Sequence, residues 1–161
     1  MKLGVMSDSH DHVPNVRKAV ELFCAEGVGL VVHAGDFVAP FALDPLRDLP
    51  CKVVAVLGNN DGEKVGLQKR CESMGFELQP KMATAQLGGR KIAVVHEPEP
   101  VEGLARSGLF DIVVYGHTHK IDIEKGKTLI LNPGEVGGWV TGRATVAVVD
   151  LDTLEVALHD L

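Results

Sequence analysis

The chain has 161 residues, of which 45% are hydrophobic and 24% charged, and its formal net charge is −6. This composition predicts a single globular domain over residues 1–161. The acidic balance argues against strong nucleic-acid binding, which needs many lysines and arginines. Three scattered cysteines favour neither a disulfide framework nor a thiolate zinc site. No charged leader and no apolar run of about 18 residues is present, so we expect a cytoplasmic protein without membrane contact.

The first half of the chain predicts alternating strands and helices. The apolar run Lys2–Met6 indicates a buried strand, and Val16, Val20 and Phe23 recur at helical spacing before Gly27. This order is typical of βαβ units with a parallel sheet. The elements that follow are a strand over 29–34, a short helix over 39–49, a strand over 52–57 and a helix over 63–74.

The second half predicts a different pattern, with strands that pair antiparallel at least locally. Gly88-Gly89-Arg90 is typical of a tight hairpin turn, and Glu97-Pro98-Glu99-Pro100 predicts an exposed loop, because it can continue neither a strand nor a helix. No repeat or linker divides the chain. The expected elements are a short helix over 101–107 and strands over 83–87, 91–95, 111–115, 121–124, 128–131, 144–150 and 154–159.

A polar segment, Ser7-Asp8-Ser9-His10-Asp11-His12, follows the first strand directly. The carboxyl ends of strands in an open α/β sheet line one crevice, so Asp8 and His10 would point into it. A carboxylate and an imidazole two residues apart suggest a metal site. The alternative is a strand-to-helix turn in which Asp8 or Asp11 caps the following helix, and this segment alone does not decide between them.

Side chains that can bind metal also follow four further predicted strands. Imidazoles, carboxylates and an amide oxygen form a ligand set for a pair of divalent ions. Each position also has a structural interpretation: Asp36 as a helix N-cap, for example, or His33 as a buried, hydrogen-bonded histidine, which we favour over a ligand at that position. Because such side chains recur at five strand ends, we favour metal binding over these structural interpretations. The candidates are Asp8, His10, Asp36, Asn59, His96, His117 and His119.

In this order, these residues resemble the motif series of the calcineurin-like metallophosphoesterases, and the resemblance spans nearly the whole chain. The small size and the segment Asn132-Pro133-Gly134-Glu135 are similar to the compact prokaryotic phosphodiesterase branch, which is related to the retromer scaffold subunit of vacuolar sorting. The motifs are Asp8-x-His10, Gly35-Asp36, Gly58-Asn59-Asn60-Asp61, His96 and Gly116-His117-Thr118-His119.

The resemblance implies an α/β (α+β) fold, a four-layer α-β-β-α sandwich of two mixed sheets with helices outside. It also implies two divalent ions, with Mn favoured and Ni, Fe, Co or Zn as the other candidates. Asp36 would bridge them. By similarity the ligands of one ion would be Asp8, His10, Asp36 and His119, and those of the other Asp36, Asn59, His96 and His117.

Such ions would polarise a phosphoryl group and lower the pKa of a bridging water, giving hydroxide for attack on phosphorus. The sequence therefore predicts a binuclear metal-dependent phosphodiesterase acting on a small phosphodiester. The rival is a catalytically weak scaffold protein on the same fold, and the retention of all seven ligand types favours the enzyme. A nuclease would need a basic groove, which the acidic balance does not suggest. The sequence is compatible with a homo-oligomer.

Two positions depart from the family pattern. Many phosphomonoesterases of the superfamily carry a histidine that assists the leaving group where this chain has Asn60, which cannot donate a proton. We therefore expect a preference for diesters whose leaving group needs little protonation, unless His12 or a metal-bound water supplies the proton. Relatives often have a Gly and a further His directly after the ligand histidine, where this chain has Glu97-Pro98-Glu99-Pro100, and we favour solvated surface for both glutamates. The catalytic candidates are Asp36, Asn59, His12 and Asn60.

Overall fold

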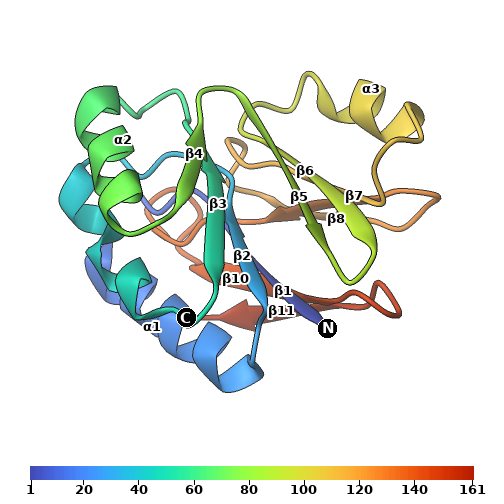
Figure 1. The fold of residues 1–161 in the computed structure, drawn as a ribbon, viewed down its shortest axis with the longest axis horizontal. Coiled ribbons are helices and arrows are strands. Elements are labelled where there is room, and N and C mark those ends of the chain that lie inside the picture. Colours follow the sequence, from blue (N-terminus) through green and yellow to red (C-terminus); the bar gives the residue numbers. More distant parts are fainter.

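The computed structural model describes all residues, 1–161, and consists of two β-sheets packed face to face (Figure 1). The six-stranded first sheet has the order β11-β10-β1-β2-β3-β4, in which β1 to β4 are parallel. Its strands are β1 Lys2–Met6, β2 Leu30–His33, β3 Lys52–Val56, β4 Glu77–Gln79, β10 Thr145–Asp150 and β11 Val156–Asp160.

The five-stranded second sheet has the order β5-β6-β7-β9-β8, in which β6, β7 and β9 are parallel. Both sheets also contain antiparallel pairs, so both are mixed, as predicted. The strands of the second sheet are β5 Met82–Leu87, β6 Arg90–Val95, β7 Ile112–Val114, β8 Ile121–Glu124 and β9 Leu129–Pro133.

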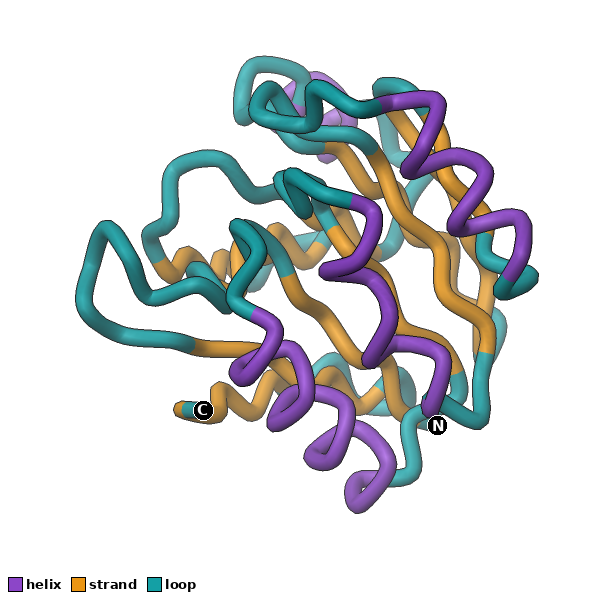
Figure 2. Tube along the Cα trace, turned by 90° about the vertical axis from the view of Figure 1, so that its left-hand side faces the viewer, coloured by secondary structure: helices purple, strands orange, loops and turns teal.

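Helices cover the outer faces of the sheets, which confirms the predicted four-layer sandwich (Figures 1 and 2). The first sheet carries α1 (Val13–Glu26), the 3-10 helix η1 (Pro40–Asp48) and α2 (Lys64–Ser73). The second sheet carries α3 (Val101–Arg106).

Alternation along the strands divides the apolar side chains between the layers. Leu3 and Val5 belong to the cluster between the two sheets, whereas Met6 packs in the cluster between the first sheet and its helices. Gly4 allows α1 to approach closely, because a Cβ at this position would lie 3.0 Å from the Phe23 ring. The core therefore fixes the two sheets and the first helix relative to one another.

The structure differs locally from the predicted elements. Strand β4 was not predicted, and the segment predicted as a short helix over 39–49 forms a 3-10 helix, in which Pro45 lacks the N–H that a regular α-helix would use. The N-cap of α1 is His12, whose Nδ1 accepts the Asn15 N–H at 3.1 Å. Neither Asp8 nor Asp11 caps this helix, so the structural alternative for the opening segment is wrong.

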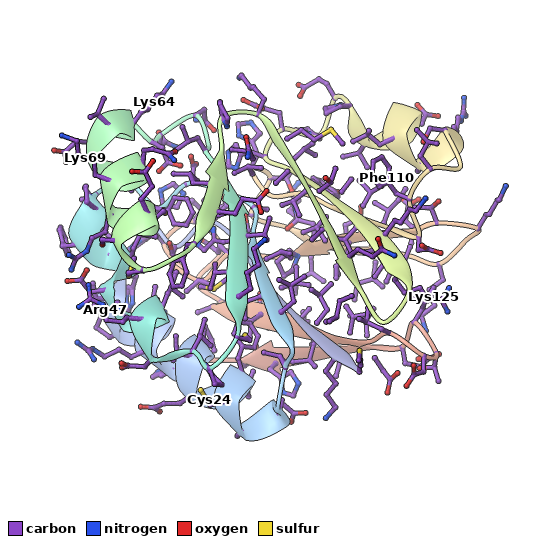
Figure 3. All side chains as sticks on the ribbon, in the orientation of Figure 1. Cys24, Arg47, Lys64, Lys69, Phe110 and Lys125 are labelled. Atoms are coloured by element: carbon purple, nitrogen blue, oxygen red, sulfur yellow. The ribbon has the colours of Figure 1, made fainter.

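The outer surface carries many charged side chains. The side chains of Arg47, Lys64, Lys69 and Lys125 extend away from the ribbon, while apolar side chains fill the space between the layers (Figure 3). None of the helices combines the length and the apolar character that crossing a bilayer requires.

Candidate metal centre

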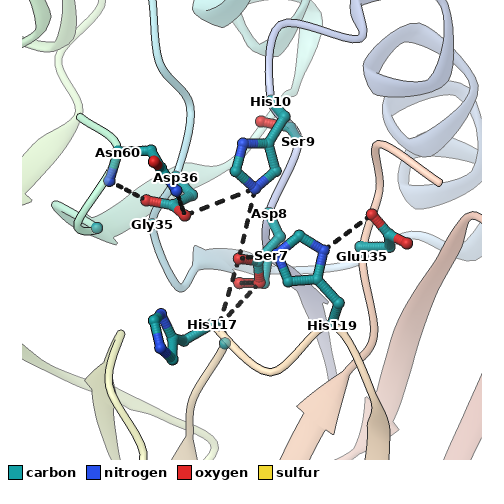
Figure 4. A network of polar contacts seen from close by, with 12 residues as sticks. Ser7, Asp8, Ser9, His10, Gly35, Asp36, Asn60, His117, His119 and Glu135 are labelled. Carbon is teal, nitrogen blue, oxygen red and sulfur yellow. Dashed lines mark hydrogen bonds and ion pairs between the residues drawn. The ribbon is translucent and has the colours of Figure 1, made fainter. Parts of the chain in front are cut away.

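The parallel strands of both sheets end at one edge, and the predicted site residues follow those ends. Figure 4 shows Asp8, His10, Asp36, His117 and His119 gathered there. Several contacts join the edges of the two sheets, and two of them involve backbone atoms of the loops. His96, after β6, donates from Nδ1 to the Ala34 carbonyl oxygen after β2 at 2.7 Å. The His117 N–H, after β7, lies 3.1 Å from Asp8 Oδ2 after β1. Residues from distant parts of the sequence are therefore assembled at one place, as the strand pattern predicted.

Backbone strain is concentrated at this edge. Eight non-glycine residues have a positive φ, which costs of order 1–3 kcal/mol each, and seven of them lie in the loops that follow β1, β2 and β7. Strain of this kind persists where the surrounding contacts determine the side-chain direction. These seven residues are Asp8, His10, Asp11, Asp36, Val38, His117 and His119.

One group of potential ligands consists of Asp8, His10 and His119, whose ligating atoms all lie within 4.8 Å of one another. His119 Nε2 is 3.5 Å from Asp8 Oδ1, and His10 Nε2 is 3.8 Å from the same oxygen. The two imidazoles stack with ring centroids 5.1 Å apart. His119 Nδ1 hydrogen-bonds to Glu135 Oε2 at 2.9 Å, so the proton belongs on Nδ1 and Nε2 keeps its lone pair for a metal.

A second group contains Asp8, Asp36 and His96. The Ala34 carbonyl holds the proton of His96 on Nδ1, which leaves its Nε2 directed at Asn59 Oδ1 at 2.8 Å. The same Asn59 oxygen is 2.8 Å from His117 Nδ1. The four residues predicted for the second ion therefore lie together, with Asp8 beside them.

Asp36 belongs to the second group and also approaches a histidine of the first. Its Oδ2 is 3.5 Å from His10 Nε2 and 3.5 Å from His96 Nε2. Asn60 donates to both oxygens, from its backbone N–H to Oδ1 and from its side chain to Oδ2, each at 2.8 Å. The carboxylate is therefore fixed in a position that both groups of histidines can share.

The two central carboxyl groups differ in their electrostatic surroundings. Burial raises the pKa of Asp8 above its usual value, although the Ser7 hydroxyl and nearby histidines oppose this. Burial also acts on Asp36, but the neighbouring His96 ring and the Asn60 donors outweigh it and hold the pKa of Asp36 well below its usual range. Asp36 is thus the more strongly favoured anion of the pair.

The donor set fits divalent metal ions. His10 Nε2 is buried and has no hydrogen-bond partner, although it lies near the carboxylates of Asp8 and Asp36. Neither carboxylate forms an ion pair with a lysine or an arginine; their ionic partners are histidines. An unpartnered imidazole nitrogen beside two buried carboxylates is what a site for a divalent cation requires.

Three buried residues that support the site were not predicted as such. Glu135 holds His119, and Asp61 accepts the N–H groups of Asp36, Val38 and Gly58 at 2.7–3.0 Å. The Asn132 side chain donates to the Gly116 carbonyl at 2.9 Å. Glu135 follows β9, a further parallel strand, so the rule that located the other residues could have located its side chain too.

The remaining predicted positions have other contacts. His33 Nδ1 accepts the Gly35 N–H and its Nε2 lies 3.2 Å from Ser9 Oγ, so both nitrogens are occupied, as expected for a buried, hydrogen-bonded histidine. His12 caps α1 and packs against Trp139. Glu97 lies 3.8 Å from the exposed Lys81 ammonium, in keeping with a surface residue.

Comparison with known proteins agrees with this geometry. Residues 1–154 match the family model described as the calcineurin-like phosphoesterase superfamily domain. A phosphodiesterase of Methanocaldococcus jannaschii is 38% identical over 159 residues, covering 96% of each chain. A phosphodiesterase of Escherichia coli K12 is 29% identical over 180 residues, covering 99% of this chain and 94% of that one.

Solved structures show the same relationship. An archaeal phosphodiesterase superposes over the whole of both chains with a TM-score of 0.94 and 36% identity. Vps29 of Chaetomium thermophilum has a TM-score of 0.71 at 16% identity, covering 100% of this chain and 95% of that one, which shows a shared fold. The chain belongs to the calcineurin-like phosphoesterase superfamily and is a phosphoesterase.

Proposed function

We propose that the protein is a binuclear metal-dependent phosphodiesterase acting on a small phosphodiester. The observation that carries the proposal is the convergence of seven potential ligands, from loops of both sheets, in a site that contains the buried and unpartnered His10 nitrogen. The phosphodiesterases among its relatives support the same activity. Asp8, His10, Asp36 and His119 would hold one ion, and Asp36, Asn59, His96 and His117 the other.

Bound divalent ions supply the polarisation of the phosphoryl oxygens and lower the pKa of the attacking water. The protein supplies position and charge. Asp36 contributes the negative charge shared by both sites, and Asn60 holds its carboxylate through two hydrogen bonds of 2.8 Å. Asn59 and His117 are exposed, so this part of the site is open to solvent.

Few side chains of the site could donate a proton to the leaving group. The Asn60 side chain is a hydrogen-bond donor to Asp36 and cannot act as an acid. His12 has its Nδ1 occupied by the Asn15 N–H, so Nε2 is the nitrogen it can present to a substrate. We therefore infer that the enzyme prefers diesters with activated aryl leaving groups. Faster turnover of an unactivated alkyl monoester than of an activated aryl diester would contradict this preference.

The proposal is tested by hydrolysis of an aryl phosphodiester and the matching monoester with Mn, Ni, Zn or Mg, together with metal analysis. Wild-type protein should bind two ions per chain. Asp36→Asn should bind fewer and lose more than about 100-fold in activity, beyond the effect typical of residues that merely support a ligand. Asp44→Asn, at an exposed carboxylate paired with Arg70, is the matched control and should retain both properties.

Two outcomes would overturn the proposal. Retained activity in Asp36→Asn would contradict the shared role of this carboxylate. Fewer than two ions per chain, without hydrolysis at any of the four metals, would instead favour a scaffold function on the same fold.

A further inference from the structure

The loop over residues 137–142 has no part in the proposed chemistry, yet it carries the only tryptophan of the chain. Trp139 is 65% exposed and the adjacent Val140 is 71% exposed. Burying a large apolar side chain stabilises a protein by about 1.5–3 kcal/mol, and Trp139 forgoes much of this. What distinguishes Trp139 from other exposed apolar residues is the set of contacts that holds it in place.

The indole is held against the site. Its Nε1–H donates to the His10 carbonyl oxygen at 3.2 Å. Its ring packs on His12, with centroids 4.9 Å apart and the planes inclined by 55°. Both partners belong to the segment that follows β1, so the position of Trp139 depends on the residues that form the candidate metal centre.

The loop backbone is fixed by the carboxylate that also holds His119. Glu135 Oε2 accepts His119 Nδ1 at 2.9 Å and the Trp139 N–H at 3.1 Å, while Oε1 accepts the Thr141 N–H at 2.6 Å. Figure 4 shows Glu135 directed at His119. Gly137 donates to the Asp8 carbonyl at 3.0 Å. A Cβ on Gly137 would lie 2.8 Å from Trp139 Cδ1, so this close approach needs glycine.

These contacts make Trp139 a preorganised aromatic surface beside the place where a phosphoryl group would bind. Metal ions recognise the phosphoryl group common to all phosphodiesters, so discrimination among the ester groups must come from contacts around it. An aromatic ring stacked on an exposed indole gains about 1–3 kcal/mol, largely independent of the identity of the ring.

We propose that Trp139, supported by His12, forms the subsite that binds a planar aromatic group carried by the phosphodiester substrate. This inference rests on the proposed phosphodiesterase function and names its substrate class. An aryl group and a nucleobase are both planar aromatic rings that can stack on the indole. Matched pairs of ligands, with and without each kind of ring, distinguish between them.

The experiment uses the Mn-loaded protein and two ligand pairs that differ in one ring: methylphosphonate against phenylphosphonate, and ribose 5-phosphate against adenosine 5′-phosphate. Each is measured as an inhibitor of aryl phosphodiester hydrolysis and by quenching of tryptophan fluorescence. Because Trp139 is the only tryptophan, fluorescence reports on this position directly. The ring-bearing member of at least one pair should bind about tenfold more tightly and quench saturably.

The variants separate stacking from other effects. Trp139→Ala should abolish the preference for the ring and leave the inhibition constant of the ringless ligand unchanged, whereas Trp139→Phe should retain part of the preference. Leu109→Ala is the control, because Leu109 is also 65% exposed but precedes β7, at the opposite end of the strand from the site. It should retain the full preference.

Failure of this inference is distinguishable from failure of the proposed function. Equal binding within each pair, unaltered in Trp139→Ala while hydrolysis persists, would overturn the subsite and leave the phosphodiesterase intact. A change of oligomeric state in Trp139→Ala without any effect on ligand preference would make Trp139 an interface residue and also overturn it. Absence of hydrolysis in the wild type contradicts the proposed function itself.

Discussion

At the scale of single residues, Glu135 joins the chemistry of the site to the surrounding structure. It is buried and binds one histidine and the N–H groups of three successive residues of the loop that follows. Burial would raise its pKa, but hydrogen bonds from Thr141 and His119 outweigh this and hold the pKa of Glu135 below its usual range. It therefore stays ionised and keeps the Nδ1 proton of His119 in place.

We expect Glu135→Gln to weaken metal binding by about 10- to 100-fold, because His119 loses the anion that orients its ring. Titration of Mn²⁺ by calorimetry measures the effect. Glu155→Gln, which removes the charge of an exposed glutamate paired with Lys125, should bind metal as the wild type does. Equal affinities in the two variants would show that Glu135 does not act through His119.

His33 provides a prediction on pH. Burial, assisted by the charge of His96, lowers the pKa of His33 from 6.5 to about 3. Between these values the unfolded chain binds a proton at this residue that the folded protein does not, so stability falls as the pH is lowered from 6.5. His33→Asn keeps an acceptor for the Gly35 N–H and removes the titration.

Unfolding by urea in the presence of a chelator, from pH 6.5 to about 4, tests this. The wild type should lose about 1.4 kcal/mol per pH unit more than His33→Asn, whatever the difference between them at neutral pH. Parallel profiles would mean that His33 is protonated in the folded protein.

At the scale of elements, glycines allow the loops to approach the site closely. A Cβ on Gly58 would meet the Asp36 carboxylate, 2.7 Å from its Cγ, and a Cβ on Gly116 would lie 2.7 Å from Asp8 Oδ2. Neither glycine has a positive φ, so space, rather than backbone conformation, restricts these positions. The loops after β3 and β7 thus depend on the absence of a side chain.

Gly58→Ala should displace Asp36 and reduce diester hydrolysis by about 100-fold, since a shift of about 1 Å in a catalytic group has that effect. Gly62→Ala is the matched control, because a Cβ there has nothing within 4 Å and the residue has no positive φ. Steady-state kinetics on both variants measure the difference. Similar losses in the two would show that flexibility of the loop, not space at Gly58, limits activity.

Much of the site could be predicted from the sequence, because each polar group follows an apolar strand and parallel strands end at one edge. This holds for Asp8, Asp36 and His96. Glu135 entered the prediction only as the last residue of the segment Asn132-Pro133-Gly134-Glu135, since the Pro133-Gly134 turn before it explains the local pattern without a functional carboxylate. Strand β4 is three residues long, which is too short for a period to be recognised.

At the scale of the whole molecule, the candidate centre connects the two sheets. Asp8 and Asp36 follow strands of the first sheet, whereas His96, His117 and His119 follow strands of the second. The apolar cluster between the sheets holds them together over most of their area. At the edge, however, two buried carboxylates lie close together among several imidazoles. Bound cations would offset the repulsion between the two carboxylates and connect the layers.

Metal should therefore stabilise the entire fold. At a free concentration of 100 times the dissociation constant, one ion adds about 2.7 kcal/mol to the free energy of unfolding. In a protein of this size, that raises the melting temperature by about 5–10 °C. Differential scanning calorimetry with Mn²⁺, and after its removal by a chelator, measures the shift. Asp36→Asn should lose most of it, because this carboxylate lies 3.5 Å from histidines of both sheets' loops. An equal shift of the melting temperature in wild type and variant would place the ion elsewhere on the protein. No shift in either would mean that bound metal does not contribute to holding the two sheets together at this edge.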